Sequence, residues 1–150
     1  MRLPYYLRSW RLGALLCACL LMAAVVGCDD RPRRVAASGR VLIDGKPLEY
    51  GFVQVVPEGD RPAIGQLGPG GRFTLTTFDE NDGVVPGTHP VAVIAMESID
   101  AVSQRWHAPK KYMSHETSGL TITVEEPTDS LEINLSWEGG QPFVERFQQE

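Results

Sequence analysis

Apolar and polar residues alternate in short runs along most of the chain after residue 35. The runs are rich in valine, isoleucine, threonine and phenylalanine, and glycine, proline, asparagine and aspartate separate them. This pattern is typical of β-strands, and no segment keeps a helical period over three turns. We predict seven strands, at Ala37–Ile43, Phe52–Val56, Ala63–Leu67, Arg72–Thr77, Pro90–Met96, Leu120–Val124 and Leu131–Leu135.

The alternation also indicates which side chains face a core. In residues 120–124, leucine, isoleucine and valine alternate with two threonines. One face of such a strand packs while the other meets water. Asp44-Gly45 follows the first predicted strand and is a strong signal for a tight hairpin turn. The expected fold class is therefore all-β, a seven-stranded sandwich over residues 35–136.

Two connections between the predicted strands are long. Residues 77–89 contain the acidic stretch Asp79–Asp82, and residues 97–119 contain aromatic, basic and histidine residues. Loops of this length in a compact domain are commonly functional or loosely ordered. After the last strand, residues 137–150 are interpreted as a polar C-terminal tail, in which Phe143 and Phe147 have the spacing of one helical turn.

The first 27 residues have the pattern of a secretion signal. Three arginines precede an apolar run, Leu12–Val26, which is too short to span ~30 Å of hydrocarbon comfortably. The run ends in Val25-Val26-Gly27-Cys28 and resembles the lipobox of bacterial lipoproteins. That resemblance implies cleavage after residue 27, lipidation of Cys28 and a short solvated tether over residues 28–34. An ordinary secreted protein and an uncleaved anchor remain alternatives.

Charge and cysteine content are consistent with an anchored envelope protein. The segment before Cys28 contains three of the 14 basic residues and none of the 19 acidic ones, so the rest has 11 basic residues and a net charge of −8. This balance argues against a nucleic-acid partner, which requires clustered cations. Cys17 and Cys19 would leave with the signal, so the mature domain has no second cysteine for an internal disulfide.

Three motifs follow one another along the predicted strands: Gly39-Arg40-Val41 with Asp44-Gly45-Lys46-Pro47-Leu48, Gly70-Gly71-Arg72-Phe73-Thr74-Leu75, and Pro86-Gly87 followed by Val91-Ala92-Val93. They resemble the motifs of carboxypeptidase regulatory-like domains. The resemblance covers about residues 35–135 and implies a transthyretin-like, or Ig-like, β-sandwich that is a non-catalytic companion or surface module. His89 stands where the family usually has tyrosine. Pro90 follows it and lacks a backbone donor, so we expect an edge strand there.

Three groups of residues suggest binding or catalytic chemistry. The oxygen-rich stretch Asp79–Asp82 could hold calcium, although it lacks the spacing of an EF-hand and also fits a solvated turn. His89, His107 and His115 are too far apart in sequence for a typical zinc pair. Ser114-His115-Glu116 contains the residue types of a hydrolytic triad, but neighbours in sequence do not have triad geometry. We predict no metal, no cofactor and no catalytic residue.

The most varied cluster is formed by Trp106, Lys110, Lys111 and Tyr112 in the second long connection. Aromatic rings beside cations can stack on a sugar or bind an acidic peptide. In the alternative interpretation, the two aromatic rings hold the loop on the domain while the lysines stay in water. These four residues are the predicted ligand-binding candidates.

The sequence therefore predicts a non-catalytic, lipid-anchored protein of the bacterial cell envelope, on the periplasmic face of the inner or outer membrane. Its expected role is structural or protein-binding, with an envelope protein as partner. A carbohydrate- or peptide-binding module that uses the long loops is the first alternative. An envelope hydrolase is the second alternative, which a pocket with converging histidine and acidic groups would favour.

Overall fold

The structure is a computed structural model that describes residues 31–147. The chain divides into two compact units. The second unit, Pro32–Glu150, which we call the body, contains all the elements described below. Strands make up 49% and helices 9% of the residues that the structure describes, which confirms the all-β prediction. The predicted signal peptide and Cys28 lie outside the described residues. Within residues 31–147, no helix is both long and apolar enough to cross a membrane.

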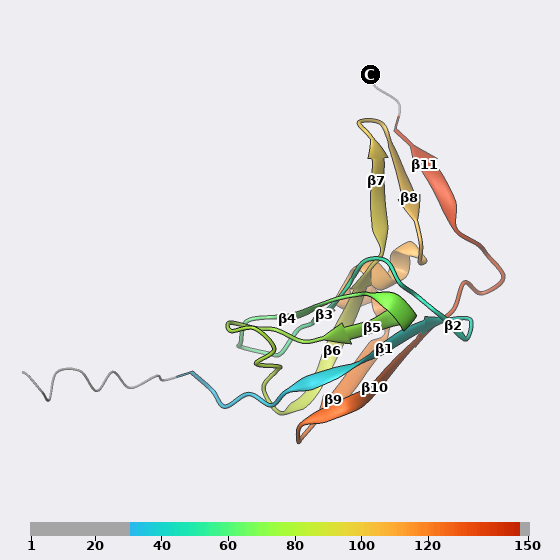
Figure 1. Cartoon of the computed structure of the whole chain (residues 1–150). Helices are drawn as coiled ribbons and strands as arrows, with labels where there is room; N and C mark the ends of the chain where they lie inside the picture. Colours follow the sequence, from blue (N-terminus) through green and yellow to red (C-terminus); the bar gives the residue numbers. More distant parts are fainter. Residues whose placement is uncertain (1–30, 148–150) are drawn as a thin grey trace, which may run out of the picture. The chain divides into compact units, whose positions relative to one another are not determined.

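The first sheet is built around β1, Ala37–Ile43. β1 pairs in parallel with β10, Thr128–Leu135, and antiparallel with both β2, Lys46–Pro47, and β5, Arg72–Thr74. The β1–β10 pair brings strands from the two ends of the body together (Figure 1). Gly39 lies opposite Leu131, where a Cβ atom would come within 2.1 Å of the Leu131 carbonyl oxygen. Glycine is therefore required at this position.

The second sheet has the order β4-β3-β6-β9 and is antiparallel throughout. Its strands are β4 (Ala63–Gln66), β3 (Phe52–Val55), β6 (Gly87–Ile94) and β9 (Leu120–Val124). Val53 pairs with Val93, and both are completely or almost completely buried. Buried side chains from the first and second sheets form one hydrophobic cluster, as the predicted alternation requires.

All seven predicted strands are present, with ends that differ by at most three residues. The structure also has β2 and a third sheet of order β11-β8-β7, made of β11 (Phe143–Arg146), β8 (Ser103–Trp106) and β7 (Met96–Asp100). β7 follows β6 after Ala95 (Figure 1). The third sheet corrects two predictions, because residues 97–119 are not one irregular loop and the tail at Phe143 is a strand rather than a helical turn.

The sequence pattern does not predict the third sheet, because polar residues stand on both of its faces. Glu97, Ser98, Gln104 and Arg105 stand at strand positions, so no apolar alternation marks them. After β8, the chain forms a short 3-10 helix, η2 (Lys110–Met113), and one turn of helix, α2 (His115–Ser118). Another 3-10 turn, η1 (Pro69–Gly71), precedes β5.

The expectation of an edge strand at Pro90 is wrong, because β6 lies between β3 and β9. The Pro90 carbonyl accepts a hydrogen bond of 2.9 Å from the Val56 amide, one residue beyond the end of β3. The nitrogen and carbonyl of one strand residue point to the same side, so the missing N–H of Pro90 also faces this region beyond β3. The proline therefore removes no ladder hydrogen bond within β3 and is tolerated in a central strand.

Candidate functional site

The start of the body is held beside the acidic loop. The Val35 amide donates to the Val84 carbonyl at 2.9 Å, and the Val84 amide donates back at 3.1 Å. Gly83 allows this approach, since its φ is +84° and a Cβ atom there would lie 1.8 Å from the Val35 carbonyl oxygen. The bridge places Arg34 between the acidic loop and the turn that contains Asp60.

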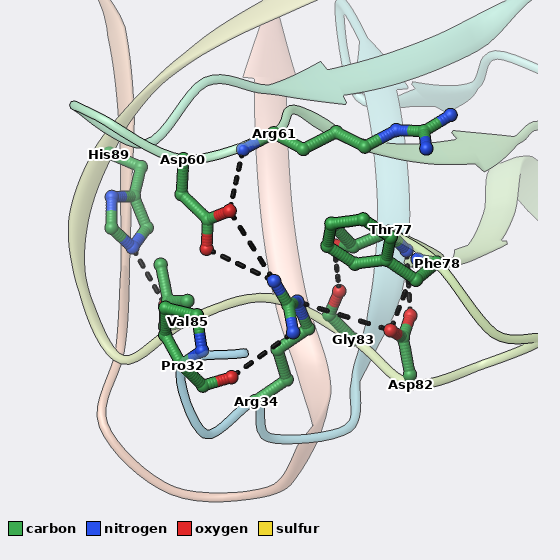
Figure 2. Close-up of polar contacts among 10 residues, drawn as sticks. All are labelled: Pro32, Arg34, Asp60, Arg61, Thr77, Phe78, Asp82, Gly83, Val85 and His89. Carbon is green, nitrogen blue, oxygen red and sulfur yellow. Dashed lines mark hydrogen bonds and ion pairs between the residues drawn. The ribbon is translucent and has the colours of Figure 1, made fainter. Parts of the chain in front are cut away.

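Arg34, Asp60, Asp82 and Phe78 form what we call the Arg34 cluster (Figure 2). Nη2 of Arg34 donates to both carboxylate oxygens of Asp60, at 3.2 and 3.3 Å, and Nε lies 3.9 Å from Oδ2 of Asp82. The guanidinium carbon is 4.4 Å from the centre of the Phe78 ring. The Arg34 side chain is only 7% exposed. At Arg34 the structure therefore differs from the predicted solvated tether.

The acidic loop is a closed turn. Asp82 accepts hydrogen bonds from the amides of Thr77 at 2.6 Å and Phe78 at 3.1 Å, and the Thr77 hydroxyl donates to the Gly83 carbonyl at 2.6 Å. Burial raises the pKa of Asp82, but the backbone hydrogen bonds and the charge of Arg34 outweigh it, so the pKa lies below its ordinary value. Asp82 therefore stays an anion that faces Arg34.

A groove of about 730 Å³ lies beside the Arg34 cluster. We call it the β4–β5 groove, because Ile64 and Gln66 of β4 and Thr74 of β5 contribute to its lining. Arg61 and Arg72 also line the groove. Arg61 extends past Phe78 in Figure 2, and its guanidinium carbon lies 5.2 Å from the centre of that ring. The groove and the Arg34 cluster therefore share one aromatic side chain.

The two aromatic residues of the predicted ligand-binding cluster are buried. Trp106 is 4% exposed and stacks on Phe143, with ring centres 6.3 Å apart. Tyr112 is 6% exposed, belongs to the hydrophobic core, and accepts a hydrogen bond of 3.1 Å from the Ser136 amide. The rings therefore do not form an open stacking surface, and the alternative in which they hold the loop on the domain accounts for their burial.

The two lysines of that cluster are held by glutamates of the C-terminal segment. Lys110 bonds to Glu145 on β11, and Lys111 bonds to Glu138. The hydrogen bond from Lys110 is the main reason that the pKa of Glu145 is lowered, and the hydrogen bond to Glu138 is the main reason that the pKa of Lys111 is raised. These pairs connect η2 to the segment that runs into β11.

The other sequence candidates do not converge. Nε2 of His89 lies 2.8 Å from the Val85 carbonyl oxygen, whereas Nε2 of His107 lies 2.9 Å from Glu97. Ser114 is the N-cap of α2 and accepts from the Glu116 amide at 3.3 Å. In residues 31–147, no group of three or more His, Cys, Asp or Glu side chains is arranged to hold a metal ion, the acidic loop included.

A second groove, of about 560 Å³, lies on another part of the body. Tyr50, His107 and Trp137 line it, and the Tyr50 and His107 rings have their centres 4.7 Å apart. Sequence reasoning missed this groove and the Arg34 cluster, because their members are widely separated along the chain. The sequence does not show that an arginine is buried. Because Arg34 follows several other charged residues, the pattern indicates a solvated segment there.

The chain was compared with models of protein families, with curated proteins and with solved structures. No family model, curated protein or solved structure matches it. The resemblance to carboxypeptidase regulatory-like domains therefore stays a prediction, and the function has to be inferred from the arrangement of the described residues.

Proposed function

We propose that this chain is a non-catalytic, lipid-anchored protein of the bacterial cell envelope that binds another envelope protein. The observation that carries the proposal is the position of Arg34, which is locked into the body six residues after Cys28. Five residues separate the two, so the connecting segment can span at most about 20 Å. A lipid on Cys28 would then hold the body close to the bilayer and bring its surfaces near other envelope proteins.

The proposed fold is the transthyretin-like sandwich of carboxypeptidase regulatory-like domains. The turn after β1 supports it, because Asp44 and Gly45 have φ values of +47° and +76°, as a tight hairpin turn requires. The common core of the first two sheets is also consistent with such a sandwich. A non-catalytic role is supported by Ser114, whose hydroxyl accepts a capping hydrogen bond instead of lying beside a general base.

Replacement of the proposed lipidated cysteine tests the anchor. We expect Cys28→Ser to leave the membrane fraction of a bacterial host, while Cys19→Ser, a matched change inside the apolar run, stays there. Mass spectrometry of the wild-type N-terminal peptide should find acyl chains on Cys28. Membrane retention of Cys28→Ser, or an unmodified Cys28 in the wild type, would refute the anchor.

The second groove favours a second candidate function, a carbohydrate- or peptide-binding module. Tyr50 is 42% exposed and Trp137 is partly exposed, so both rings are accessible, unlike those of Trp106 and Tyr112. Accessible aromatic rings beside polar side chains suit sugars and proline-containing peptides. A glycan and peptide array probed with wild type and with Tyr50→Ala plus Trp137→Ala tests this candidate. Signals that the double variant retains would exclude this groove as their source.

A further inference from the structure

We propose that the β4–β5 groove binds an acidic polypeptide segment of a partner protein, with Arg61 and Arg72 each holding a carboxylate. This inference rests on the proposed protein-binding role and names the chemistry of the partner. Guanidinium groups bind carboxylates in a planar, two-bonded geometry that favours this pairing over most other surface contacts.

The charges around the groove are unbalanced. Arg61 and Arg72 line it, and Glu80 is the single acidic residue among the lining residues, all of which the structure describes. Neither guanidinium has a carboxylate partner within residues 31–147. This imbalance stands out in a chain that carries a net charge of −5, where acidic side chains are in excess. An anionic ligand would supply the missing partners.

Arg72 lies among charged neighbours of both signs. Arg72 on β5 lies directly opposite Arg40 on β1, and like charges in this position repel. Glu132 compensates the charge of Arg40, whose guanidinium donates hydrogen bonds of 2.6 and 2.9 Å to the carboxylate. Arg72 shares a small hollow with Asp129 and Glu132. It forms no ion pair with either among the described residues, so its guanidinium stays available to a carboxylate from outside.

The register of the strands separates the two arginines along the groove. Ile64 pairs with Thr76, and the Gly68 amide bonds to the Arg72 carbonyl, so Arg72 lies beside residue 68. Arg61 precedes residue 68 by seven residues, which corresponds to roughly 20 Å of extended chain. A ligand that reaches both groups therefore needs about seven residues of extended peptide with carboxylates near its ends.

The side chains between the arginines favour peptide over sugar. Thr74 contributes a hydroxyl group, and Ile64 is 47% exposed for apolar contact. Thr76 and Gln66 also line the groove, although each already has a hydrogen bond to the backbone, with Asn81 and Gly51 respectively. No tryptophan or tyrosine is among the residues that line the groove, all of them within the described range, and these are the rings on which sugars commonly stack. An extended acidic segment with an apolar residue near its centre matches this surface.

The test uses the full chain in detergent micelles and fluorescein-labelled decaglutamate, with binding followed by anisotropy at low salt. We expect Arg61→Gln plus Arg72→Gln to weaken binding about tenfold or more, because two charge-assisted contacts are lost. The matched control is Lys46→Gln plus Arg146→Gln, which removes the same charge elsewhere. We expect this control to weaken binding by no more than about twofold. Equal losses in the two variants, or no binding by the wild type, would overturn the proposal.

A second arm separates a peptide from an anionic lipid as the ligand. The Cys28→Ser chain, which cannot carry the lipid, is mixed with vesicles of phosphatidylcholine and phosphatidylglycerol. We expect no vesicle binding that depends on Arg61 and Arg72. Arginine-dependent vesicle binding without decaglutamate binding would assign the groove to lipid and refute the peptide. Because peptide binding is measured without a membrane, failure of the anchor leaves this result intact, and loss of peptide binding leaves the anchor intact.

Discussion

Replacement of Arg34 by methionine tests whether the start of the body is clamped by the Arg34 cluster. Methionine keeps the apolar stem but removes the charge that meets Asp60 at 3.2 Å and Asp82 at 3.9 Å. Breaking a fully buried ion pair costs about 3–5 kcal/mol, because an uncompensated charge stays inside. The side chains of Asp60 and Asp82 are 17% and 19% exposed, so water relieves part of this cost.

The remaining terms give the expected size of the effect. Asp82 keeps its two backbone hydrogen bonds in the variant, which lowers the penalty further. Loss of the cation–π contact with Phe78 adds about 0.5–1 kcal/mol. We expect Arg34→Met to lower the free energy of unfolding by about 3 kcal/mol, which shifts the urea midpoint by about 2 M at a typical slope.

The assay is urea unfolding at pH 7, followed by circular dichroism, with Arg40→Met as the matched control. Arg40 also pairs with a carboxylate, but its side chain is 54% exposed, so its loss should cost at most about 1 kcal/mol. If the two variants have the same midpoint, Arg34 does not clamp the chain. The difference should also depend on pH. The folded-state pKa of Asp82 is lowered, so the stabilisation is complete above its ordinary value of 3.8 and fades as the pH falls further.

Two further changes test the packing around the same region and the third sheet. Gly83→Ala should lower the free energy of unfolding by more than about 3 kcal/mol, because its φ is positive and its Cβ would meet the Val35 carbonyl; a thermal midpoint equal to wild type would contradict this. Glu145→Gln should weaken the contacts of residue 145 with Lys110 and with the indole N–H of Trp106, and so expose Trp106. Iodide should then quench more tryptophan fluorescence, whereas unchanged quenching would show that β11 is held by other contacts.

The central strands could be predicted because burial on one face leaves a readable period. The ends of β1 and β9 are as predicted, since each alternates apolar and polar side chains between two clear turn signals. β7 and β8 have no such period, because polar residues stand on both of their faces and few of their side chains, Trp106 among them, are buried. The last predicted strand begins at Leu131, three residues after the true start of β10. Thr128, Asp129 and Ser130 are exposed or partly exposed polar residues, and such a run is typical of a turn. Parallel pairing of β1 with β10 has no local sequence signal at all.

The candidate sites were harder to predict than the strands. The sequence pattern singles out Trp106 and Tyr112 as aromatic residues near cations, yet both rings are buried in the folded body. Sequence proximity of aromatic and basic residues does not distinguish a binding surface from a packed loop, because both uses favour large rings with a polar edge. A charge acquires its meaning from its neighbours in space, which the pattern along the chain does not give.

Phe78 connects the clamp and the proposed binding groove. Arg34 lies 4.4 Å and Arg61 5.2 Å from the centre of its ring, so two like charges share one aromatic surface. Asp60 and Asp82 compensate Arg34, whereas the guanidinium of Arg61 has no carboxylate partner among the described residues and lies over the ring. A ligand carboxylate that bound Arg61 would therefore reduce the repulsion on Arg34 as well. Occupation of the groove should in this way strengthen the contacts of Arg34 with Asp60 and Asp82, and by reciprocity an intact Arg34 cluster should tighten binding in the groove.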